Sequence, residues 1–407
     1  MKLLFITDNY PPERNAPAVR TFEHVSQWAS IEGNEITIIT CFPNFPYGKV
    51  YEGYKNKIYS VEYKKGVRIF RVWSYTSSNS GTFKRILDFF SFSLSASILG
   101  LFLKSDIIIA TSPQFFTTWA AFFIAKIKKV PWIFELRDLW PESIASVDAI
   151  KNRFILRLLE KIEILLYKDC NKVIAVTESF KENLISRGIN KNKIEVITNG
   201  VSSDFFNKKN CLEVDLNLRN KLKNKFVIGY IGTHGMSQGL DFVLKSVKRI
   251  NLLNLHFLFI GNGAEKNKLK ELAQNLKIKN VTFINSIERE KLSTYYDLID
   301  VSLVCLKKSN TFKKVIPSKI FEACAMNKPI LLGVEGEAKR LIKKYNSGIS
   351  YLPENHEDFA KKIKLIMERS TYNSLKKGCF YLAKNHNREF LALKMLKIIK
   401  EVYKSNI

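Results

Sequence analysis

The chain has 407 residues, of which 46% are hydrophobic, and its 65 lysines and arginines outnumber its 38 aspartates and glutamates to give a net charge of +27. This length suggests two domains, because single hydrophobic cores rarely grow beyond about 250–300 residues. The six cysteines contain no CxxC pair, which argues against a disulfide framework and a zinc site.

The charge is compatible with an anionic membrane or a phosphorylated substrate. Nucleic acid is not expected, because the lysines are spread along the whole chain and no basic helix or aromatic RNA-reading motif is present. The N-terminal MKLLFITDNYPPER has too short an apolar run for a secretory signal and predicts a first strand.

Short apolar runs alternate with amphipathic stretches along the first half of the chain. They occupy residues 3–7, 35–40, 66–72, 106–112, 131–136, 172–177 and 193–200. After a polar stretch at 207–225, a second series occupies 226–232, 255–263, 280–284, 300–305, 329–333 and 347–352. This pattern predicts two doubly wound parallel-sheet domains with a boundary near 203–225.

Two aromatic-rich segments lie in the first half, at 83–104 and 112–129, and each is flanked by basic residues. The first is marginal in length for a membrane span, is interrupted by Asp88, and is followed at once by an expected strand. We therefore expect region 83–129 to lie at the inner membrane surface, with two ordinary buried helices as the alternative.

The loop after the first strand of the second domain is rich in glycine, with Gly229, Gly232, Gly235 and Gly239 in FVIGYIGTHGMSQGLDFVL. Missing side chains let a backbone approach a phosphate, although the run also fits a simple tight turn. A nicotinamide site is not indicated, because the next strand ends in IGNGAE without the expected ribose-binding acid.

The stretch VIPSKIFEACAMNKPIL begins like a helix. Pro317 suits its first turn, Ser318 is expected to cap it, and Glu322 lies within about one turn of its positive end. Glu322 is either a dipole-stabilised surface acid or a carboxylate that accepts the hydroxyls of a ribose. In the second reading, Lys319 beside it binds the diphosphate.

Seven motifs follow one another along the chain: ITDNYPPERNAPAVR (6–20), CFPNFPYGKVYEGY (41–54), FELRDLWPESI (134–144), VITNGVSSDFF (196–206), GTHGMSQGLDFVL (232–244), IGNGAEKNKL (260–269) and PSKIFEACAMNKPIL (317–331). This ordered set resembles glycosyltransferase family 4, the retaining, nucleotide-sugar-dependent enzymes of the GT-B fold, and within it the WbuB-like branch that builds bacterial surface polysaccharides.

The resemblance implies an α/β protein with two Rossmann-like doubly wound domains facing a central cleft. Residues 1–205 would bind the acceptor and residues 206–385 the nucleotide-sugar donor. The segment 386–407 would be a helix that crosses back to the first domain.

For the donor site, the resemblance implies that Glu322 is the second glutamate of the family's E-x7-E element and holds the ribose. Lys314 stands where the first glutamate usually contacts the sugar. Lys319, with Lys313 or Lys314 as weaker candidates, is expected to bind the diphosphate, and Ser318 is expected to belong to the same donor-binding set.

The glycine loops complete this expected site. Gly232 would approach the donor, and Thr233 and Gln238 stand where the family often has an arginine and a lysine. Gly263 and Glu265 resemble family positions near the nucleotide base, with a capping role for Glu265 as the alternative.

In the first domain, the family's glycine pair is replaced by small residues in RNAPAVR. Ala16 and Pro17 still permit close approach to a sugar, and Arg14 and Arg20 are expected to face phosphates or the acceptor.

Arg137 and Asp138 occupy the place of a frequent family histidine-aspartate pair, so a histidine mechanism there is excluded. Asp138 would orient an acceptor hydroxyl, with an N-cap or a loop salt bridge as the alternative. The histidines nearest the expected ligand loops, His24 and His234, are more readily structural than catalytic.

The implied reaction moves a sugar, from a UDP-linked donor such as an N-acetylated deoxyhexose, with retention onto an undecaprenyl-diphosphate-linked saccharide in O-antigen or capsule synthesis. No metal or cofactor is expected, and the protein would work in the cytoplasm, peripherally on the inner face of the membrane. A sugar-nucleotide epimerase and a noncatalytic saccharide-binding protein are the alternatives.

Overall fold

The computed structural model describes residues 1–13, 15–45, 47–77, 82–112, 115–139, 152–202, 215–288 and 291–406. The chain forms two compact units. Unit 1 comprises Met1–Thr198 and Arg388–Ile407, and unit 2 comprises Asn199–Asn387. Much of the expected boundary region, residues 203–214, lies outside the described residues.

The sheet of unit 1 has the strand order β3-β4-β2-β1-β5-β6-β7-β8 within the described residues. All neighbouring strands are parallel except β3 and β4, which are antiparallel. The strands are β1 (Lys2–Ile6), β2 (Glu35–Cys41), β3 (Tyr59–Lys64), β4 (Val67–Val72), β5 (Ile107–Thr111), β6 (Trp132–Leu136), β7 (Lys172–Ala175) and β8 (Ile194–Val196).

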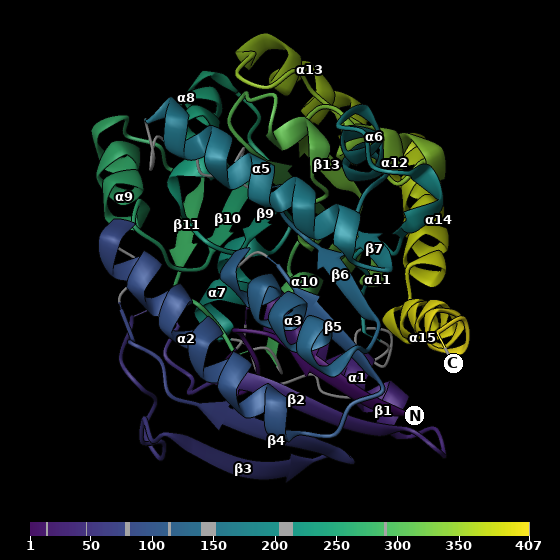
Figure 1. The fold of residues 1–407 in the computed structure, drawn as a ribbon. Helices are drawn as coiled ribbons and strands as arrows, with labels where there is room; N and C mark the ends of the chain where they lie inside the picture. The colour runs from purple at the N-terminus through teal and green to yellow at the C-terminus, as the bar shows by residue number, and fades with distance from the viewer. Residues whose placement is uncertain are drawn as a thin grey trace. The chain divides into compact units, whose positions relative to one another are not determined.

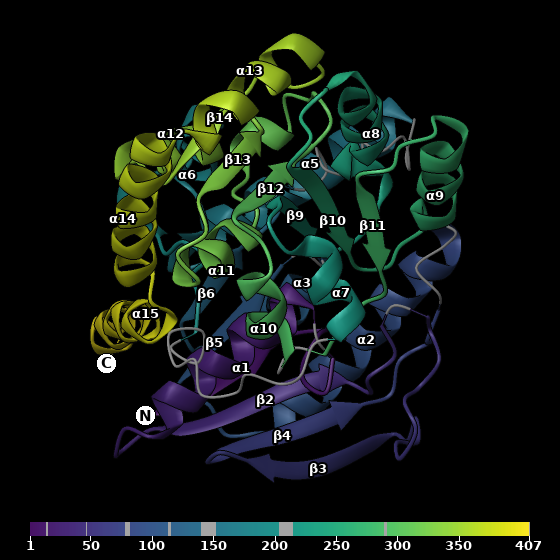
Figure 2. The same ribbon diagram turned by 180° about the vertical axis from the view of Figure 1, so that it is seen from behind.

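Helices cover both faces of this sheet (Figures 1 and 2). Val25 and Trp28 of the first helix share a core with Ile36 and Ile38 of β2. On the opposite face, Gly100 packs against Ile124 and the side chain of Ile39. The helices are α1 (Ala16–Ala29), α2 (Thr82–Phe102), α3 (Phe115–Lys128), α5 (Arg153–Asp169), α6 (Glu178–Ser186) and α15 (Arg388–Lys404), with a 3-10 turn η1 (Lys191–Lys193).

The C-terminal helix α15 belongs to unit 1 and packs on α1. The Trp28 indole N–H donates to the carbonyl of Ala392 at 2.8 Å, and Arg388 pairs with Glu23 at 2.5 Å. The chain therefore leaves unit 1 after Thr198 and returns to it at Arg388.

Unit 2 has a sheet of parallel strands in the order β11-β10-β9-β12-β13-β14 within the described residues. The order reverses between β9 and β12, which makes a topological switch point. The strands are β9 (Phe226–Ile231), β10 (Leu255–Ile260), β11 (Val281–Ile284), β12 (Val301–Cys305), β13 (Ile330–Gly333) and β14 (Gly348–Ser350).

Alternate residues of these strands face opposite layers, as β-structure requires. Phe257 and Phe259 of β10 pack with α8, α9 and α13, whereas Leu258 and Ile260 pack with α11, α12 and α14. The helices are α7 (Leu216–Leu222), α8 (Leu240–Arg249), α9 (Lys266–Asn275), α10 (Leu292–Asp297), α11 (Lys319–Ala325), α12 (Glu337–Tyr345), α13 (His356–Met367) and α14 (Arg369–Asn385), with 3-10 turns η3 (Met236–Gln238) and η5 (Phe312–Lys314).

The prediction of two Rossmann-like doubly wound α/β domains is confirmed. Every predicted apolar run contains a strand. The strand β3 was not predicted, because its residues are largely exposed and lack a continuous apolar run.

Candidate functional site

In unit 2, the loops after β9 and β10 and the segment before α11 contain most of the predicted donor residues. The first two leave the carboxyl ends of neighbouring strands, beside the switch point between β9 and β12. Open α/β sheets bind their ligands at such a place.

Lys319 lies at the centre of this group. Its Nζ is 3.9 Å from the centroid of the Tyr230 ring and donates to the Tyr230 hydroxyl at 2.7 Å. Burial lowers the pKa of Lys319 to about 8, although Cys305 and Glu322 act in the opposite direction. Within the described residues, the negative charge around Lys319 does not fully offset the cost of burying its ammonium. A bound anion nearby would therefore stabilise the charged form of this side chain.

The glycine loop after β9 converges on the same point. A Cβ on Gly232, whose φ is +143°, would lie 2.9 Å from the Lys319 Nζ, so glycine is required for this close approach. The Tyr230 hydroxyl lies 2.6 Å from the carbonyl oxygen of Thr233 and 3.1 Å from Oε1 of Gln238. The structure thus brings together Gly232, Thr233, Gln238 and Lys319, all of which the sequence indicated.

Gly263 and Glu265 lie in the loop after β10, which packs on the loop after β9. A Cβ on Gly263 would lie 2.4 Å from the carbonyl oxygen of His234. Glu265 makes no capping hydrogen bond at the start of α9 and instead pairs with Lys268 at 3.1 Å. The capping alternative for Glu265 is therefore wrong, because its carboxylate turns along the helix toward a lysine three residues later.

Ser318 does not cap α11, so the prediction of a serine cap is wrong. Its own backbone is helical, with φ −59° and ψ −28°, whereas a capping residue usually has an extended backbone. Glu322 lies in the first turn of α11 and is electrostatically coupled to Lys319 and to Tyr296. Lys314 lies in η5, before this turn.

His234 is fully buried within the same loop and contacts the aromatic rings of Tyr230, Phe259 and Phe283. Burial, together with Lys266 and Lys319, lowers its pKa to about 4. His234 is therefore neutral at physiological pH, and its surroundings support the structural interpretation.

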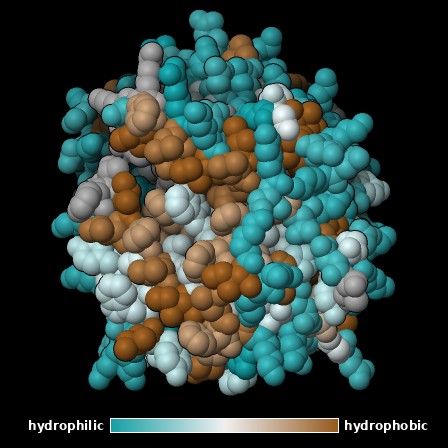
Figure 3. All heavy atoms as spheres, in the orientation of Figure 1, coloured by the Kyte–Doolittle hydropathy of each residue, from teal (hydrophilic) through white to brown (hydrophobic). Residues whose placement is uncertain are grey.

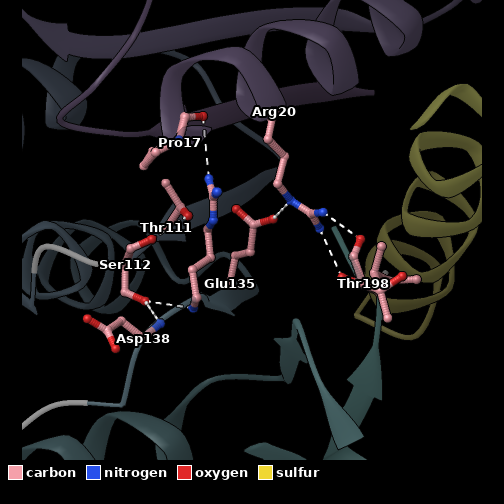
Figure 4. Close-up of polar contacts among 9 residues, drawn as sticks. Pro17, Arg20, Thr111, Ser112, Glu135, Asp138 and Thr198 are labelled. Atoms are coloured by element: carbon pink, nitrogen blue, oxygen red, sulfur yellow. Dashed lines mark hydrogen bonds and ion pairs between the residues drawn. The ribbon is translucent and has the colours of Figure 1, made fainter. Parts of the chain in front are cut away.

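In unit 1, the side chain of Arg20 is buried and donates hydrogen bonds to residues inside the domain. Its Nε lies 3.0 Å from Glu135, and its terminal nitrogens donate to the carbonyls of Ile197 and Thr198 (Figure 4). Both side chains of the ion pair are 2% exposed. This geometry corrects the expectation that Arg20 faces a phosphate or an acceptor, because its donors join α1 to β6 and to the end of β8.

Glu135 remains ionised in this environment. Burial alone would raise its pKa, but Arg20, Arg137 and the Thr111 hydroxyl together hold it below its ordinary value. The buried carboxylate thus serves as the counter-ion of two arginines.

Arg137 and Asp138 follow β6 directly, and both backbone N–H groups point at the Ser112 hydroxyl, at 2.8 and 3.4 Å (Figure 4). The Arg137 guanidinium donates to the carbonyl of Pro17 at 3.4 Å. Burial and the nearby Arg20 and Arg388 lower the pKa of Arg137 to about 10, against the pull of Glu135. The ends of β5 and β6 are thereby tied to the start of α1.

Ala16 and Pro17 form the start of α1, where Asn15 caps the helix by accepting from the N–H of Ala18 at 3.0 Å. Arg14 lies outside the described residues. His24, further along α1, is buried against Trp28, and burial together with Arg20, Arg388 and Arg137 lowers its pKa, which fits a structural role.

Three acids with raised pKa values, Asp8 and Glu13 after β1 and Asp88 in α2, were not singled out as site residues. Burial raises the pKa of Asp8 and Glu13, and raises that of Asp88 to about 6. One Glu13 oxygen accepts the backbone N–H groups of Asn44 and Phe45, both at 2.9 Å. The feature of the sequence that could have revealed this group is Asp88, an acid in the otherwise apolar run of α2.

No group of three or more histidine, cysteine, aspartate or glutamate side chains within the described residues is placed to hold a metal ion. The expectation that the chemistry needs no metal stays a prediction.

Two family models match the chain. Residues 18–205 match Glycosyltransferase Family 4, and residues 216–379 match Glycosyl transferases group 1. The Escherichia coli protein WcaI, named for colanic acid biosynthesis as a glycosyl transferase, is 26% identical over 336 residues, covering 80% of this chain and 81% of WcaI.

Solved structures share the fold over almost the whole chain. The sucrose-phosphate synthase of Thermosynechococcus elongatus superposes with a TM-score of 0.74 at 15% identity, covering 99% of both chains. Anabaena HepE, solved in complex with UDP and glucose, superposes with a TM-score of 0.71 at 13% identity, covering 98% of this chain and all of HepE. Both matches show that this chain shares the fold of two Rossmann-like domains with these proteins.

Proposed function

We propose that the chain is a glycosyltransferase of the group 1 and family 4 type. It would transfer a sugar from a nucleoside-diphosphate donor to a lipid-diphosphate-linked saccharide during bacterial surface polysaccharide synthesis. The observation that carries the donor part is Lys319, a partly buried cation held against the glycine loop after β9. The naming of WcaI for colanic acid biosynthesis supports the polysaccharide part.

Unit 2 is the proposed donor domain. Lys319 would bind the diphosphate, the backbone around Gly232 and Thr233 would approach it closely, and Glu322 would accept the ribose hydroxyls. Gly263 and Glu265 would lie toward the base. The UDP complex of HepE, which shares the fold, supports UDP as the nucleotide to test first.

We propose that transfer proceeds with retention. The acceptor oxygen forms its bond to the anomeric carbon on the face that the diphosphate leaves, and the departing diphosphate oxygen takes the acceptor proton. Negative charge grows on the diphosphate as the bond breaks, so a fixed ammonium beside it lowers the barrier without a metal. Asp138 would orient the acceptor hydroxyl, while Arg137 keeps the end of β6 in place.

The class of the donor sugar is proposed from the residue at position 314. Lys314 stands where an acid is usual, so a sugar recognised mainly through uncharged or acidic groups fits better than one that requires a carboxylate partner. An N-acetylated deoxyhexose is the class to screen first.

A lipid-linked acceptor requires that the enzyme reach the membrane, and unit 1 has an apolar surface suited to it. The exposed side of α2 carries a stripe at helical spacing, namely Ile86, Phe90, Leu94, Ile98 and Phe102, with exposed fractions from 39% to 81%. Brown side chains gather over the face of α2 and α3 in Figure 3. Patches of this kind mark interaction surfaces in soluble domains.

The neighbouring helices extend this surface. Phe123 and Ile127 of α3 are exposed, as are Phe154, Leu158 and Leu165 of α5, and α3 contacts both other helices. Exposed cations such as Lys84, Lys126 and Arg157 stand among them. Apolar side chains mixed with lysine and arginine suit a bilayer that contains anionic lipids.

The segment Lys84–Phe102 is long and apolar enough to cross a membrane, with only 28% of it buried. Its other side nevertheless packs into unit 1, where Phe92 and Ala96 are fully buried. We therefore propose that α2 lies on the inner face of the membrane and does not span it.

Radiolabelled donor transfer to a lipid extract tests the proposal. Purified protein, the extract and a panel of UDP-sugars should give a labelled lipid product with one donor. Interconversion of the sugar without an acceptor would favour an epimerase. Neither product with any donor would favour a noncatalytic saccharide-binding protein.

The donor assignment has a separate test. Glu322→Ala should weaken UDP binding strongly in calorimetry while circular dichroism stays unchanged, whereas the exposed Glu271→Ala should match the parent. Unchanged affinity in Glu322→Ala would remove Glu322 from the ribose site.

A further inference from the structure

Lys266 is a buried lysine in a protein whose lysines are mostly at the surface. It is the first residue of α9 and is 6% exposed. Four oxygens lie within hydrogen-bond distance of its ammonium and share its three N–H groups: the carbonyl of Gly261 at 2.7 Å, Oδ1 of Asn262 at 2.8 Å, the carbonyl of Ile284 at 2.9 Å, and Oδ1 of Asn285 at 2.7 Å.

These acceptors come from the ends of two neighbouring strands. Gly261 and Asn262 follow β10, and Asn285 follows β11, whose last residue is Ile284. Figure 2 shows β11, β10 and β9 side by side, with α9 next to them. One ammonium therefore joins the two loops at the point where the ladder of backbone hydrogen bonds between the strands ends.

The loop held by Lys266 in turn supports the glycine loop of the donor site. The N–H of His234 donates to the carbonyl of Asn262 at 2.9 Å, and the N–H of Glu265 donates to the carbonyl of His234 at 3.0 Å. The glycine loop on its other side touches Lys319. Close contacts thus run without a gap from Lys266 to the proposed diphosphate site.

The charge of Lys266 matters to this arrangement. Four partly negative oxygens that point at one place repel one another, and a cation between them offsets this repulsion. A neutral side chain of the same length would take away the donor that these oxygens share, and within the described residues only the Ile284 carbonyl would keep another one, the N–H of Gly261 at 3.2 Å.

We infer that Lys266 is a positioning residue of the donor site: its ammonium acts as an internal cation that fixes the loops after β10 and β11, and through them the glycine loop that meets the diphosphate. This inference rests on the proposed function only for its effect on UDP. The effect on the loops themselves is independent of it.

The test compares Lys266→Ala with Lys270→Ala, which removes an equally charged but exposed lysine of the same helix. Amide hydrogen exchange of the peptides covering 260–266 and 284–287 should rise in Lys266→Ala and stay at the parent level in Lys270→Ala. UDP affinity should fall about tenfold in Lys266→Ala, as loss of a charge-assisted hydrogen-bond group implies.

Chemical rescue separates the charge from the packing. Propylammonium replaces the atoms that Lys266→Ala lacks, so it should restore slow exchange and UDP affinity, whereas neutral propanol should restore neither. Lys266→Met, which keeps the volume, serves if the alanine variant does not fold, and it should behave like the alanine variant.

Parent-like exchange and parent-like UDP affinity in Lys266→Met would overturn the inference, as would equal rescue by propanol. If the parent protein binds no UDP, the donor proposal fails, and the exchange and rescue measurements still decide the role of Lys266.

Discussion

The ammonium of Lys319 lies over the ring of Tyr230 and also donates to its hydroxyl at 2.7 Å, so one aromatic side chain holds the cation in place from two directions. Tyr230 comes from β9 and Lys319 from the start of α11. The pair therefore fixes a positive charge at the carboxyl end of the central strand, where the sheet topology places a ligand.

The lowered pKa of Lys319, about 8, predicts how UDP binding depends on pH. A bound diphosphate favours the ammonium, so binding above pH 8 must take up a proton. The affinity of the parent should then fall by up to about tenfold per pH unit above that point. Calorimetry in buffers of different ionisation enthalpy measures the uptake.

Lys319→Met provides the control for this pH dependence. It should bind UDP more weakly at pH 7 and show no proton uptake. A parent whose UDP affinity is flat between pH 7 and pH 9.5 would show that Lys319 does not face the diphosphate.

Arg20 and Glu135 predict a stability effect instead of a binding effect. Arg20→Met leaves a buried carboxylate without its main partner and should cost about 3–5 kcal/mol. The double variant Arg20→Met with Glu135→Leu should recover part of this loss. Denaturant unfolding of the parent, the two single variants Arg20→Met and Glu135→Leu, and the double variant gives the coupling energy, and additive effects would contradict a direct pair.

The pair of Arg20 and Glu135 also predicts how the folding stability changes at low pH. The pKa of Glu135 is held below its ordinary value, so its contribution to stability is present above that ordinary value and is lost as the pH falls through the lowered one. The parent should therefore lose stability in strong acid more steeply than the double variant.

Asp88 predicts a pH effect of opposite sign. Burial raises its pKa to about 6, so the folded state favours the protonated acid, and stability is lost as the pH rises from the ordinary value through 6. Asp88→Asn should raise the Tm at pH 8 and change it little at pH 4, while the exposed Glu52→Gln should do neither. An equal shift of Tm at both pH values would contradict this account.

The apolar face of unit 1 predicts binding to anionic vesicles. Replacing Phe90, Leu94 and Ile98 by serine should reduce flotation with phosphatidylglycerol vesicles, because their exposed area would no longer enter the bilayer. Leu253→Ser in unit 2, where the side chain is 89% exposed, is the control. Flotation of the triple variant equal to that of the parent would place the membrane contact elsewhere.

The strands of both sheets could be predicted from the sequence because parallel strands covered on two faces form continuous apolar runs. The edge strand β3 could not, since exposed residues such as Tyr59 and Tyr63 interrupt its pattern. Strand β3 forms through its antiparallel backbone pairing with β4, and this pairing cannot be recognised from the hydrophobic pattern of its residues.

Within the site, the convergence of Gly232, Gln238 and Lys319 followed from motifs that each lie in one loop. The true partner of Arg20 was not predictable in that way, because Glu135 lies 115 residues further along the chain. The role of Lys266 was not predicted for a related reason. Two of its four acceptors are backbone carbonyls, and the positions of backbone carbonyls cannot be read from residue types.

A crystal structure with UDP tests the central claim most directly. We predict that the diphosphate lies within hydrogen-bond distance of the Lys319 ammonium, next to Gly232, and that the ribose hydroxyls donate to Glu322. UDP bound away from the loop after β9, or a Glu322 carboxylate turned from the ribose, would contradict the account.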